Sequence, residues 1–467
     1  MANDQLTNSQ MRDIEALLHP YTNAEQHRKV GAHLIDSGEG IYVYDEDGKR
    51  YIEGMSGLWC AGLGFGDKEL IECAQEQLAK LPYYHLFGGR THEPAIELAE
   101  KIKDMFPVPM SRVFYCSSGS EANDTQIKLV WYMMNATGRP EKKKIISRKK
   151  GYHGVTMVSA SLTGLPYNHN SFDLPFDFVK HTTTPHFWRE GQEGETEAEF
   201  VARLAKDLED LILAEGPETV AAFIAEPVMG AGGVIVPPEG YFKAVGDILE
   251  KYEIMFIDDE VICGFGRTAN WFGCTTHGMD QGGRAPTSVS MAKQLTGAYA
   301  PLSAVAMNAE MAEAIEMESA RQPVLGHGYT YGGHPLGCAV GVKTLELYQS
   351  RDILGNVRKV APRFEAHLKR LGEHSLVGEA RVSGLMGGLE LSPDPETAAM
   401  FDTPGKVAGQ VSKELLSHGV ILRAIGDTVA FCPPMVITEQ EIDEMFENVE
   451  TALDAAAHWA KGEGLLA

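Results

Sequence analysis

A single lysine at the end of an apolar run is the most reactive group that the sequence offers. The segment is Met291-Ala292-Lys293-Gln294-Leu295. An apolar setting disfavours the charged ammonium form, so the amine of Lys293 would be nucleophilic enough to form a Schiff base. A lysine at a strand end is more often a surface residue, so this segment alone does not decide between the two interpretations.

Three consecutive acids, Asp258, Asp259 and Glu260, follow the apolar run that includes Phe256. A buried carboxylate without a partner costs considerable free energy, so the pattern predicts a cationic group nearby. Asp259 and Val261 are two residues apart and would share one face of a strand. One could then reach a protonated ring nitrogen while the other packs under the ring. A metal site or an exposed strand end remain alternatives.

Small residues with free N–H groups stand between a predicted strand and a helix that begins near Glu121. They are Ser117-Ser118-Gly119-Ser120. The first turn of a helix has unpaired donors and a positive dipole end, which favours an anion such as phosphate. A plain turn with a serine cap explains the segment equally well. The lysine of a P-loop is absent.

Two glycine-rich loops could surround a flat cofactor. The first, Gly151–Gly154, contains Tyr152 and His153, whose rings could stack on it, although His153 could equally be an ordinary loop histidine. The second, 328–335, contains the hydroxyl of Thr330, which could reach a phosphate. Each of these signals is weak alone, and their order along the chain carries the argument.

Short apolar runs that alternate with helical stretches must position these groups. The predicted strands are 113–116, 221–224, 254–257, 289–291 and 304–307. This alternation predicts an α/β domain with a mostly parallel sheet. The clearest helix is expected from Glu197 to Ala214, with a capping box of Thr196 and Glu199 and a stop at Gly216.

The pattern changes after about residue 345 to longer helices around a few strands, which predicts a smaller α+β domain. The strands are expected at 382–391, 420–425 and 429–432, and the last helix at 439–461. We therefore divide the chain into an N-terminal segment (1–75), a large domain (76–345) and a C-terminal domain (346–467). The first segment, with a strand pair at 40–52, is too small for its own core and is expected to pack on the C-terminal domain or on a partner chain.

Composition excludes several classes of function. With 65 Asp and Glu against 41 Lys and Arg, the net charge of −24 disfavours nucleic acid and anionic lipid as partners. No apolar stretch is long enough to span a membrane. The seven cysteines contain no C-x-x-C pair, so neither a disulfide framework nor a metal site is predicted. The first eight residues lack the features of a signal peptide, which predicts a cytoplasmic protein.

Taken in order, these motifs resemble those of the class III, ω-amino-acid branch of the fold type I pyridoxal-phosphate aminotransferases. The matching segments are 118–122, 152–154, 225–227, 259–261, 264–267, 292–293 and 330–331. The resemblance implies a large domain with a mostly parallel seven-stranded sheet and a smaller α+β domain.

The resemblance also implies roles for individual residues. Lys293 would carry pyridoxal 5'-phosphate as a Schiff base, Asp259 would pair with its ring nitrogen, and Val261 and Tyr152 would enclose the ring. The family's active site lies at a dimer interface, so Thr330 would complete the phosphate site of the neighbouring subunit in a homodimer. The remaining cofactor-binding residues implied are Ser118, Gly119, Ser120, His153 and Glu226.

Within the class, segments 57–60, 81–84 and 423–427 resemble those of ω-transaminases that use pyruvate. Tyr21, Trp59 and Phe87 would then line the substrate pocket beside Tyr152, and Arg423 would pair with an acceptor carboxylate. The expected reaction moves an amino group from a primary amine or ω-amino acid to pyruvate or a similar 2-oxo acid with ping-pong kinetics. Simple core packing remains an alternative role for Trp59, and an exposed strand position for Arg423.

Two departures from the family pattern stand beside the lysine. Gln294 occupies a position where most relatives carry glycine, and the loop 281–287 lacks the usual proline-aspartate pair. After Phe87, relatives usually carry bulkier residues than Gly88 and Gly89, which predicts a wider pocket for longer or branched amines.

Three other functions remain open on the sequence alone. An aminomutase, a racemase or a decarboxylating aminotransferase could use the same scaffold, because a fold does not fix a function. A binding protein could keep the fold without turnover, although it would need neither Lys293 nor Asp259. A nicotinamide dehydrogenase would depend on the incomplete glycine motif at 230–233.

Overall fold

The structure is a computed structural model that describes residues 6–466. The signal-peptide argument draws on residues 1–8, of which the first five lie outside the described range. Within that range, no helix is long and apolar enough to cross a membrane.

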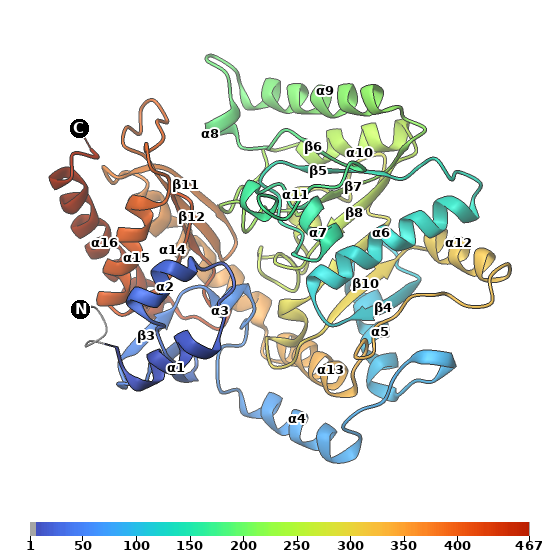
Figure 1. The fold of residues 1–467 in the computed structure, drawn as a ribbon, viewed down its shortest axis with the longest axis horizontal. Helices are drawn as coiled ribbons and strands as arrows, with labels where there is room; N and C mark the ends of the chain where they lie inside the picture. Colours follow the sequence, from blue (N-terminus) through green and yellow to red (C-terminus); the bar gives the residue numbers. More distant parts are fainter. Residues whose placement is uncertain (1–5, 467) are drawn as a thin grey trace.

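A seven-stranded sheet forms the centre of the larger part of the molecule (Figure 1). β10 is antiparallel to both of its neighbours, β4 and β9, and all other adjacent pairs are parallel. The prediction of a mostly parallel seven-stranded sheet is therefore confirmed. In spatial order the strands are β4 (Arg112–Cys116), β10 (Ser303–Met307), β9 (Ser288–Met291), β8 (Met255–Asp259), β7 (Val220–Ala225), β5 (Lys144–Arg148) and β6 (Val179–Thr182).

Helices cover both faces of this sheet, and successive strand residues contribute to the two sides in turn. Ile257 of β8 packs in one cluster with α6 (Gly119–Ala136) and α12 (Ala309–Ser319), whereas Phe256 packs in another with α10 (Tyr241–Lys251). A strand whose two faces are both buried appears as a continuous apolar run, which is why β7 and β8 were recognisable in the sequence. Helix α7 (Met157–Leu162) lies beside α6.

Helix α9 (Glu197–Glu215) confirms the predicted amphipathic helix, one residue longer than expected. The Thr196 side chain accepts from the backbone of Glu199, and the Glu199 carboxylate accepts from the backbone N–H of Thr196. Gly216 ends the helix with a φ of 89°. Its buried residues recur at intervals of four, so one stripe faces the core: Phe200, Leu204, Leu208 and Ile212.

The smaller part of the molecule contains a four-stranded antiparallel sheet and long helices. The sheet order is β11 (Val377–Ser383), β12 (Met386–Leu391), β15 (Thr428–Phe431) and β14 (Arg423–Ile425). The helices are α14 (Ile353–Leu371), α15 (Lys406–Ser417) and α16 (Glu439–Gly462). This separate smaller α+β part agrees with the predicted fold class.

Two strand predictions in this part were wrong. The predicted strand 382–391 is a hairpin whose turn contains Gly384 at a φ of 60°. A Cβ there would lie 2.5 Å from the carbonyl oxygen of Arg267, so a side chain does not fit. The predicted strand 420–425 is also two strands, because β13 (Val420–Ile421) leaves β14 and joins another sheet.

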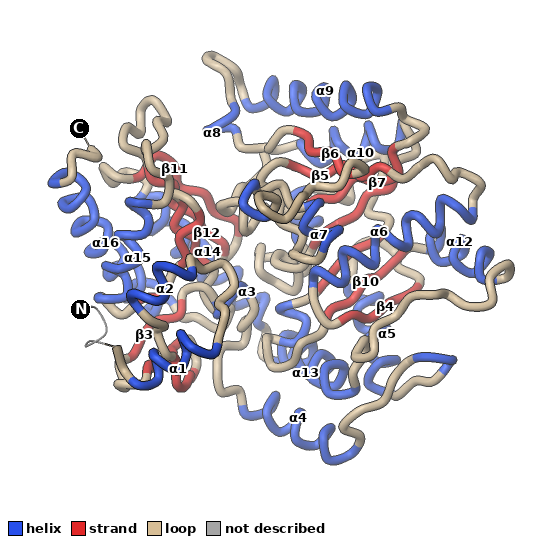
Figure 2. Tube along the Cα trace, viewed as in Figure 1, coloured by secondary structure: helices blue, strands red, loops and turns tan. Residues whose placement is uncertain are grey.

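That other sheet pairs N-terminal strands with β13, which packs against α15 and α16, and Figure 2 shows β3 (Arg50–Glu53) beside these helices. The order of this sheet is β1 (Ile35–Glu39), β2 (Tyr42–Asp45), β3 and β13, and β3 pairs in parallel with β13. Helices α1 (Asn8–Ala16) and α2 (Ala24–Val30) precede it. The remaining helices are α3 (Ser56–Trp59), α4 (Lys68–Lys80), α5 (Glu93–Met105), α8 (Phe187–Glu190), α11 (Gly273–His277) and α13 (Pro335–Ser350).

Candidate active site

A cavity of about 200 Å³ lies where the parallel strands end. Residues that follow β4, β5, β7 and β9, together with the end of β8, contribute to its wall, as expected for a ligand site at the carboxyl ends of an α/β sheet. The predicted residues that line it are Tyr21, Trp59, Gly119, Ser120, Tyr152, His153, Glu226, Asp259, Val261, Lys293 and Arg423.

Asp259, the last residue of β8, is nearly inaccessible to solvent, with 3% of its surface exposed. Its Oδ2 accepts hydrogen bonds of 2.8 Å from Asn123 Nδ2 and from His153 Nδ1. Its Oδ1 accepts a third, of 3.1 Å, from the backbone N–H of Val261. These donors replace the water that a buried carboxylate loses, so the geometry stabilises a negative charge at this wall.

Lys293 stands two residues after β9 and has a φ of 48°, in the left-handed region. Such a conformation is costly for a residue with a Cβ and is characteristic of functional sites. Burial lowers the pKa of the Lys293 amine, while the thiol of Cys60 and the carboxylates of Asp259 and Glu226 act in the opposite direction. A lowered pKa increases the fraction of neutral, nucleophilic amine.

The N-terminus of α6 opens onto the same cavity. Ser118 caps this helix by accepting from the backbone N–H of Glu121 at 3.2 Å. Gly119 and Ser120 form its first turn and line the cavity. A Cβ on Gly119 would lie 3.1 Å from Cγ1 of Val261, so the absence of a side chain at Gly119 leaves space between α6 and Val261. The first turn of an 18-residue helix is a favourable position for a phosphate group.

Tyr152 and Val261 provide flat and apolar surfaces in the same cavity. Glu226, directly after β7, accepts from the backbone N–H of Tyr152 at 2.9 Å and from that of Gly230 at 3.0 Å. Burial raises the pKa of the Glu226 carboxyl. Glu226 therefore connects two loops of the wall, and this explains why an acid stands inside the protein.

The opposite wall comes from distant parts of the sequence. The hydroxyl of Tyr21 accepts from Asn168 Nδ2 at 2.7 Å, and Trp59 is buried with 1% of its surface exposed. Arg423 lies at the start of β14, opposite Ala430 of β15. The connection after α1, the end of α3 and strand β14 thus bring an aromatic pair and a guanidinium to the cavity that contains Lys293.

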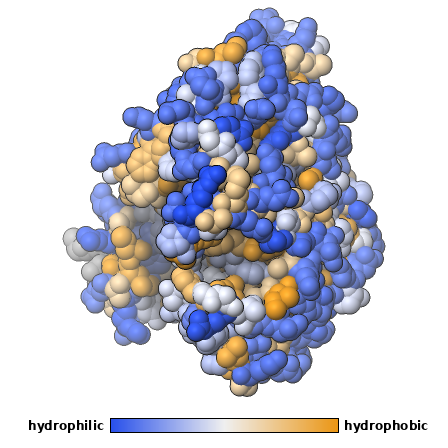
Figure 3. Space-filling view, turned by 90° about the vertical axis from the view of Figure 1, so that its right-hand side faces the viewer, coloured by the Kyte–Doolittle hydropathy of each residue, from blue (hydrophilic) through white to orange (hydrophobic). Residues whose placement is uncertain are grey.

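Phe87 and Thr330 do not line this cavity. Phe87, in the short helix η2 (Phe87–Gly89), is 49% exposed and lines a second cavity together with Gly328. The carbonyl of Thr330 accepts from the hydroxyl of Tyr83 at 2.8 Å. Figure 3 looks onto the side where α12 and the edge strand β4 lie in Figure 1, and this face is hollowed and carries both hydrophobic and hydrophilic groups.

Several lining residues were not assigned a role from the sequence. Asn123 follows Gly119 by about one helical turn, so helical spacing could have indicated that the two residues share one face of α6. Leu58, Gly154, Ala231 and Ala292 belong to segments that the sequence motifs singled out, namely 57–60, 151–154, 230–233 and 292–293. No local pattern identified Tyr167 and Ile262, since only tertiary packing brings them to the cavity.

The other two acids of the 258–260 group lie away from the cavity. Glu260 accepts from the backbone N–H groups of Gly273 (3.0 Å) and Cys274 (2.7 Å) at the start of α11. Among the described residues, neither carboxylate oxygen of Asp258 has a hydrogen-bond partner. Burial raises the pKa of Asp258 well above its usual range and that of Glu260 to about 7. A proton held by this pair accounts for two adjacent buried acids.

The glycine stretch 230–233 does not form a dinucleotide-binding loop. Gly233 donates its N–H to the carbonyl of Gly230 at 3.1 Å, inside a turn closed by the bridge between Met229 and Ile235. A dinucleotide fingerprint would place these glycines at the start of a helix, whereas α10 begins only at Tyr241.

Comparison with known proteins identifies the family. The family described as "Aminotransferase class-III" matches residues 22–453. The chain is 45% identical to γ-aminobutyrate transaminase 3 (chloroplastic) of Solanum lycopersicum over 438 residues, which cover 94% of this chain and 83% of that protein. It is 46% identical to γ-aminobutyrate transaminase 1 (mitochondrial) of Oryza sativa subsp. japonica, covering 94% and 84%.

Solved structures agree with this assignment. The ω-transaminase from Pseudomonas jessenii in complex with PMP superposes with a TM-score of 0.95 at 47% identity, covering 97% of this chain and 99% of that one. A thermostable ω-transaminase variant engineered for asymmetric synthesis of enantiopure bulky amines gives the same values. With a partly buried lysine, a stabilised carboxylate and a helix N-terminus around one cavity, the chain belongs to the class III aminotransferases and is a transaminase that uses pyridoxal phosphate.

Proposed function

We propose that this transaminase moves an amino group from a primary amine or ω-amino acid to pyruvate or a similar 2-oxo acid by a ping-pong mechanism. The observation that carries the proposal is that Arg423 and Lys293 line one small cavity. A guanidinium can bind a carboxylate through two parallel hydrogen bonds, which suits a 2-oxo acid acceptor. Tyr21 and Trp59 provide an aromatic surface for the remainder of an amine.

The cavity-lining residues, together with Ser118, which caps α6 outside the lining, fit pyridoxal phosphate group by group. Lys293 would hold it covalently, Asp259 would face its ring nitrogen, and Val261 and Tyr152 would enclose the ring. Ser118, Gly119 and Ser120 would hold its phosphate, with His153 and Glu226 fixing the surrounding wall. When bound, the cofactor supplies an electron sink for the carbanion formed at the substrate carbon.

The residues of this chain then have two tasks. The Asp259 carboxylate, held by three hydrogen bonds, keeps a proton on the ring nitrogen opposite to it. The Lys293 amine, once the substrate amine has displaced it, would carry a proton from the substrate carbon to C4′ of the cofactor. Burial lowers its pKa, which favours the neutral form that accepts this proton. Both tasks need a dry site, which the buried aromatic wall at Trp59 supports.

Names of relatives support this substrate class. The curated relatives are γ-aminobutyrate transaminases, and one structural relative was engineered for bulky amines. An ω-amino acid and an amine without a carboxylate can share one pocket if Arg423 pairs with the carboxylate in the first case and swings away in the second. Gly88 and Gly89, which offer no bulky side chain after Phe87, favour longer or branched amines; comparable or slower rates for long amines than for short ones would contradict this.

The arrangement of Phe87 and Thr330 supports a homodimer with shared active sites. In a single chain both lie outside the cavity, and Phe87 (49%) and Tyr331 (63%) expose large aromatic surfaces. A second copy seated on this face would bury them and could complete each cavity with Thr330 and Phe87 of the partner. We also propose a cytoplasmic location, because seven free thiols fit a reducing compartment. Fractionation of source cells would test this location.

The visible absorbance of the purified protein tests the proposed reaction. We expect the cofactor band to fall when a primary amine or γ-aminobutyrate is added and to return when pyruvate is added, with release of alanine. A band that responds to amine but never to pyruvate would overturn the acceptor. Isomerised or decarboxylated product without alanine would favour an aminomutase or a decarboxylating enzyme.

The conservative variant Asp259→Asn provides the matched test of the site. It keeps the shape of the side chain but removes the charge opposite the ring nitrogen, so kcat should fall at least about a hundredfold. Cofactor content measured by absorbance after denaturation is the control for simple loss of binding. An unchanged kcat at full cofactor content would contradict the role of Asp259.

A further inference from the structure

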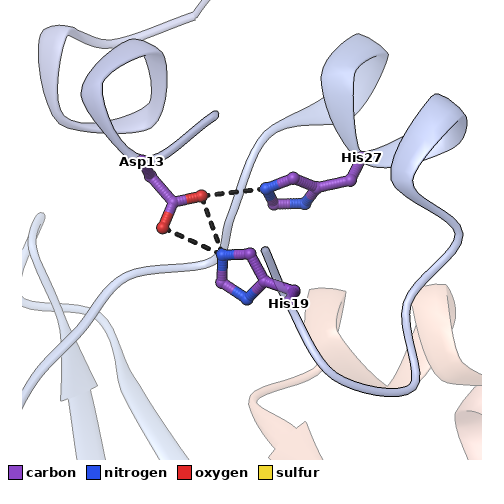
Figure 4. A group of neighbouring side chains, drawn as sticks. All are labelled: Asp13, His19 and His27. Carbon is purple, nitrogen blue, oxygen red and sulfur yellow. Dashed lines mark hydrogen bonds and ion pairs between the residues drawn. The ribbon is translucent and has the colours of Figure 1, made fainter. Parts of the chain in front are cut away.

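Three side chains near the N-terminus, none of which lines the active-site cavity, converge on one point (Figure 4). Asp13 belongs to α1, His27 belongs to α2, and His19 lies in the connection between them. Nε2 of His19 is 2.9 Å from both carboxylate oxygens of Asp13, and Nε2 of His27 is 2.8 Å from Oδ2. The two imidazole rings lie 4.4 Å apart.

This set has the composition and the geometry of a metal site. Two imidazole nitrogens and a carboxylate oxygen are a common ligand set for Zn²⁺. The three ligand atoms lie within 4.8 Å of one another. Zinc bonds of about 2.1 Å at tetrahedral angles separate ligands by about 3.4 Å, so the side chains need to move apart by only about half an ångström.

Burial also fits such a site. The side chains of Asp13 and His27 are 14% and 11% exposed, whereas that of His19 is 31% exposed. The first two are thus partly shielded from solvent, and the more exposed His19 leaves the cluster accessible to an ion. The strongly negative chain raises the local concentration of cations. The sequence predicted no metal because these residues are six and eight positions apart and match no standard spacing.

We propose that Asp13, His19 and His27 form a Zn²⁺ site that holds α1, α2 and the connection carrying Tyr21 in one fixed arrangement. Tyr21, which lines the active-site cavity and accepts from Asn168, lies between the two histidine ligands in the sequence. An ion bound to all three ligands closes α1, the Tyr21 connection and α2 into one loop. The site is independent of the proposed substrates.

Zinc binding to the purified holoenzyme, freed of excess cofactor, tests this proposal. A chromophoric chelator competes for the ion while Zn²⁺ is titrated, and Co²⁺ replaces it to give a spectroscopic signature of the ligands. We expect one ion per chain, and His27→Gln should weaken binding at least about tenfold and alter the Co²⁺ spectrum. Equal zinc affinity in the wild type and the variant would overturn the proposal.

His33→Gln is the matched control, because His33 belongs to the same segment but pairs with Asp45 instead. It should bind zinc as the wild type does. Asp13→Asn, which keeps the shape of the side chain, should lose affinity as His27→Gln does.

Tryptic cleavage after Arg28 provides a second readout of zinc binding. Zinc should slow this cleavage in the wild type and in His33→Gln only. Unchanged thermal unfolding without zinc shows that a variant has folded, and zinc protection of His27→Gln would contradict the site.

Discussion

At the scale of single residues, Gln294, the neighbour of Lys293, connects that segment to Trp59 in the cavity wall. Its side-chain amide donates to the carbonyl of Trp59 at 3.1 Å, and the hydroxyl of Tyr348 donates to its backbone oxygen at 2.9 Å. A Cβ on Gly62 would lie 2.2 Å from Oε1 of Gln294, so that glycine leaves space for the longer side chain. The departure from the family pattern is thus accommodated by packing.

Replacing Gln294 by alanine should therefore weaken both stability and substrate binding. The change leaves the buried carbonyl of Trp59 without its donor, which costs about 1–3 kcal/mol in the free energy of unfolding. Trp59 should become more mobile, so KM for the amine should rise more than kcat falls. Urea unfolding and steady-state kinetics measure the two effects, and wild-type values in both would contradict this account of Gln294.

The candidate reactive residues were recognisable from the sequence because they stand at the ends of predicted strands. Lys293 and Asp259 follow apolar runs, so their positions could be inferred from local pattern and family resemblance. Tyr167 and Ile262 carry no such signal, because the fold alone brings them to the cavity. Phe87 shows a further limit: it lines another cavity in this chain, and its predicted place in the substrate pocket would need the proposed second chain.

At the scale of elements, apolar periodicity predicted the buried strands but not the turns that interrupt them. The hairpin of β11 and β12 has no polar turn sequence, since Gly384 and the buried Leu385 connect the strands. The apolar pattern of the sequence continues through such a turn, so the two strands are predicted as one. The break between β13 and β14 depends on pairing with β3, which lies nearly 370 residues earlier.

The end of β8 makes a prediction about pH. Burial raises the pKa of Asp258 and that of Glu260, the latter to about 7, so the folded chain keeps protons that the unfolded chain loses above about pH 4.5. This contribution to stability is complete at low pH and is lost as pH rises through the folded values. Asp258→Asn should therefore stabilise the protein at pH 8 by about 1–3 kcal/mol.

The difference in stability between Asp258→Asn and the wild type should shrink as the pH falls toward 5, where Asp258 and Glu260 of the wild type hold their protons. Chemical unfolding of both proteins at several pH values measures it. Asp36→Asn, at an exposed strand position, is the control and should change stability little at any pH. A variant that is less stable than the wild type at pH 8 would show that Asp258 has an unrecognised partner.

An ion network joins β11 to the loop that forms one wall of the active site. The guanidinium of Arg381 donates to the carbonyl of Gly233 at 2.6 Å and to that of Val234 at 3.2 Å. It also donates to the carboxylates of Glu390, at 2.6 Å, and Glu379. Arg381 thus fixes the loop that includes Ala231 against the smaller part of the molecule.

Replacing Arg381 by lysine should be costly although the charge is kept. One ammonium group cannot reach both carboxylates and both carbonyls, so buried acceptors lose their donors. We expect a loss of about 2–4 kcal/mol, seen as a lower urea midpoint. Arg363→Lys is the control, because Arg363 pairs with Asp443 at a half-exposed position and should change stability by less than about 1 kcal/mol. Equal effects of the two changes would contradict a structural role for Arg381.

At the scale of the whole molecule, each proposed active site needs residues from two chains. Thr330 lies outside the cavity of its own chain, and Tyr331 beside it is 63% exposed. If Thr330 completes the phosphate site of the partner, its effect must act in trans. Light scattering should then give the mass of a dimer, and Thr330→Ala should weaken cofactor binding about tenfold through loss of a phosphate contact.

Mixed dimers of Lys293→Ala with Thr330→Ala distinguish a trans contact from a contact within one chain. When Thr330 acts in trans, one site of the mixed dimer carries both changes and the other carries neither. The unchanged site should bind cofactor with wild-type affinity. When Thr330 acts in cis, each site carries one change and no wild-type site exists. Activity of purified mixed dimers at limiting cofactor measures this. About half of the wild-type activity supports the shared site, whereas about half of the activity of the Thr330→Ala dimer would contradict it.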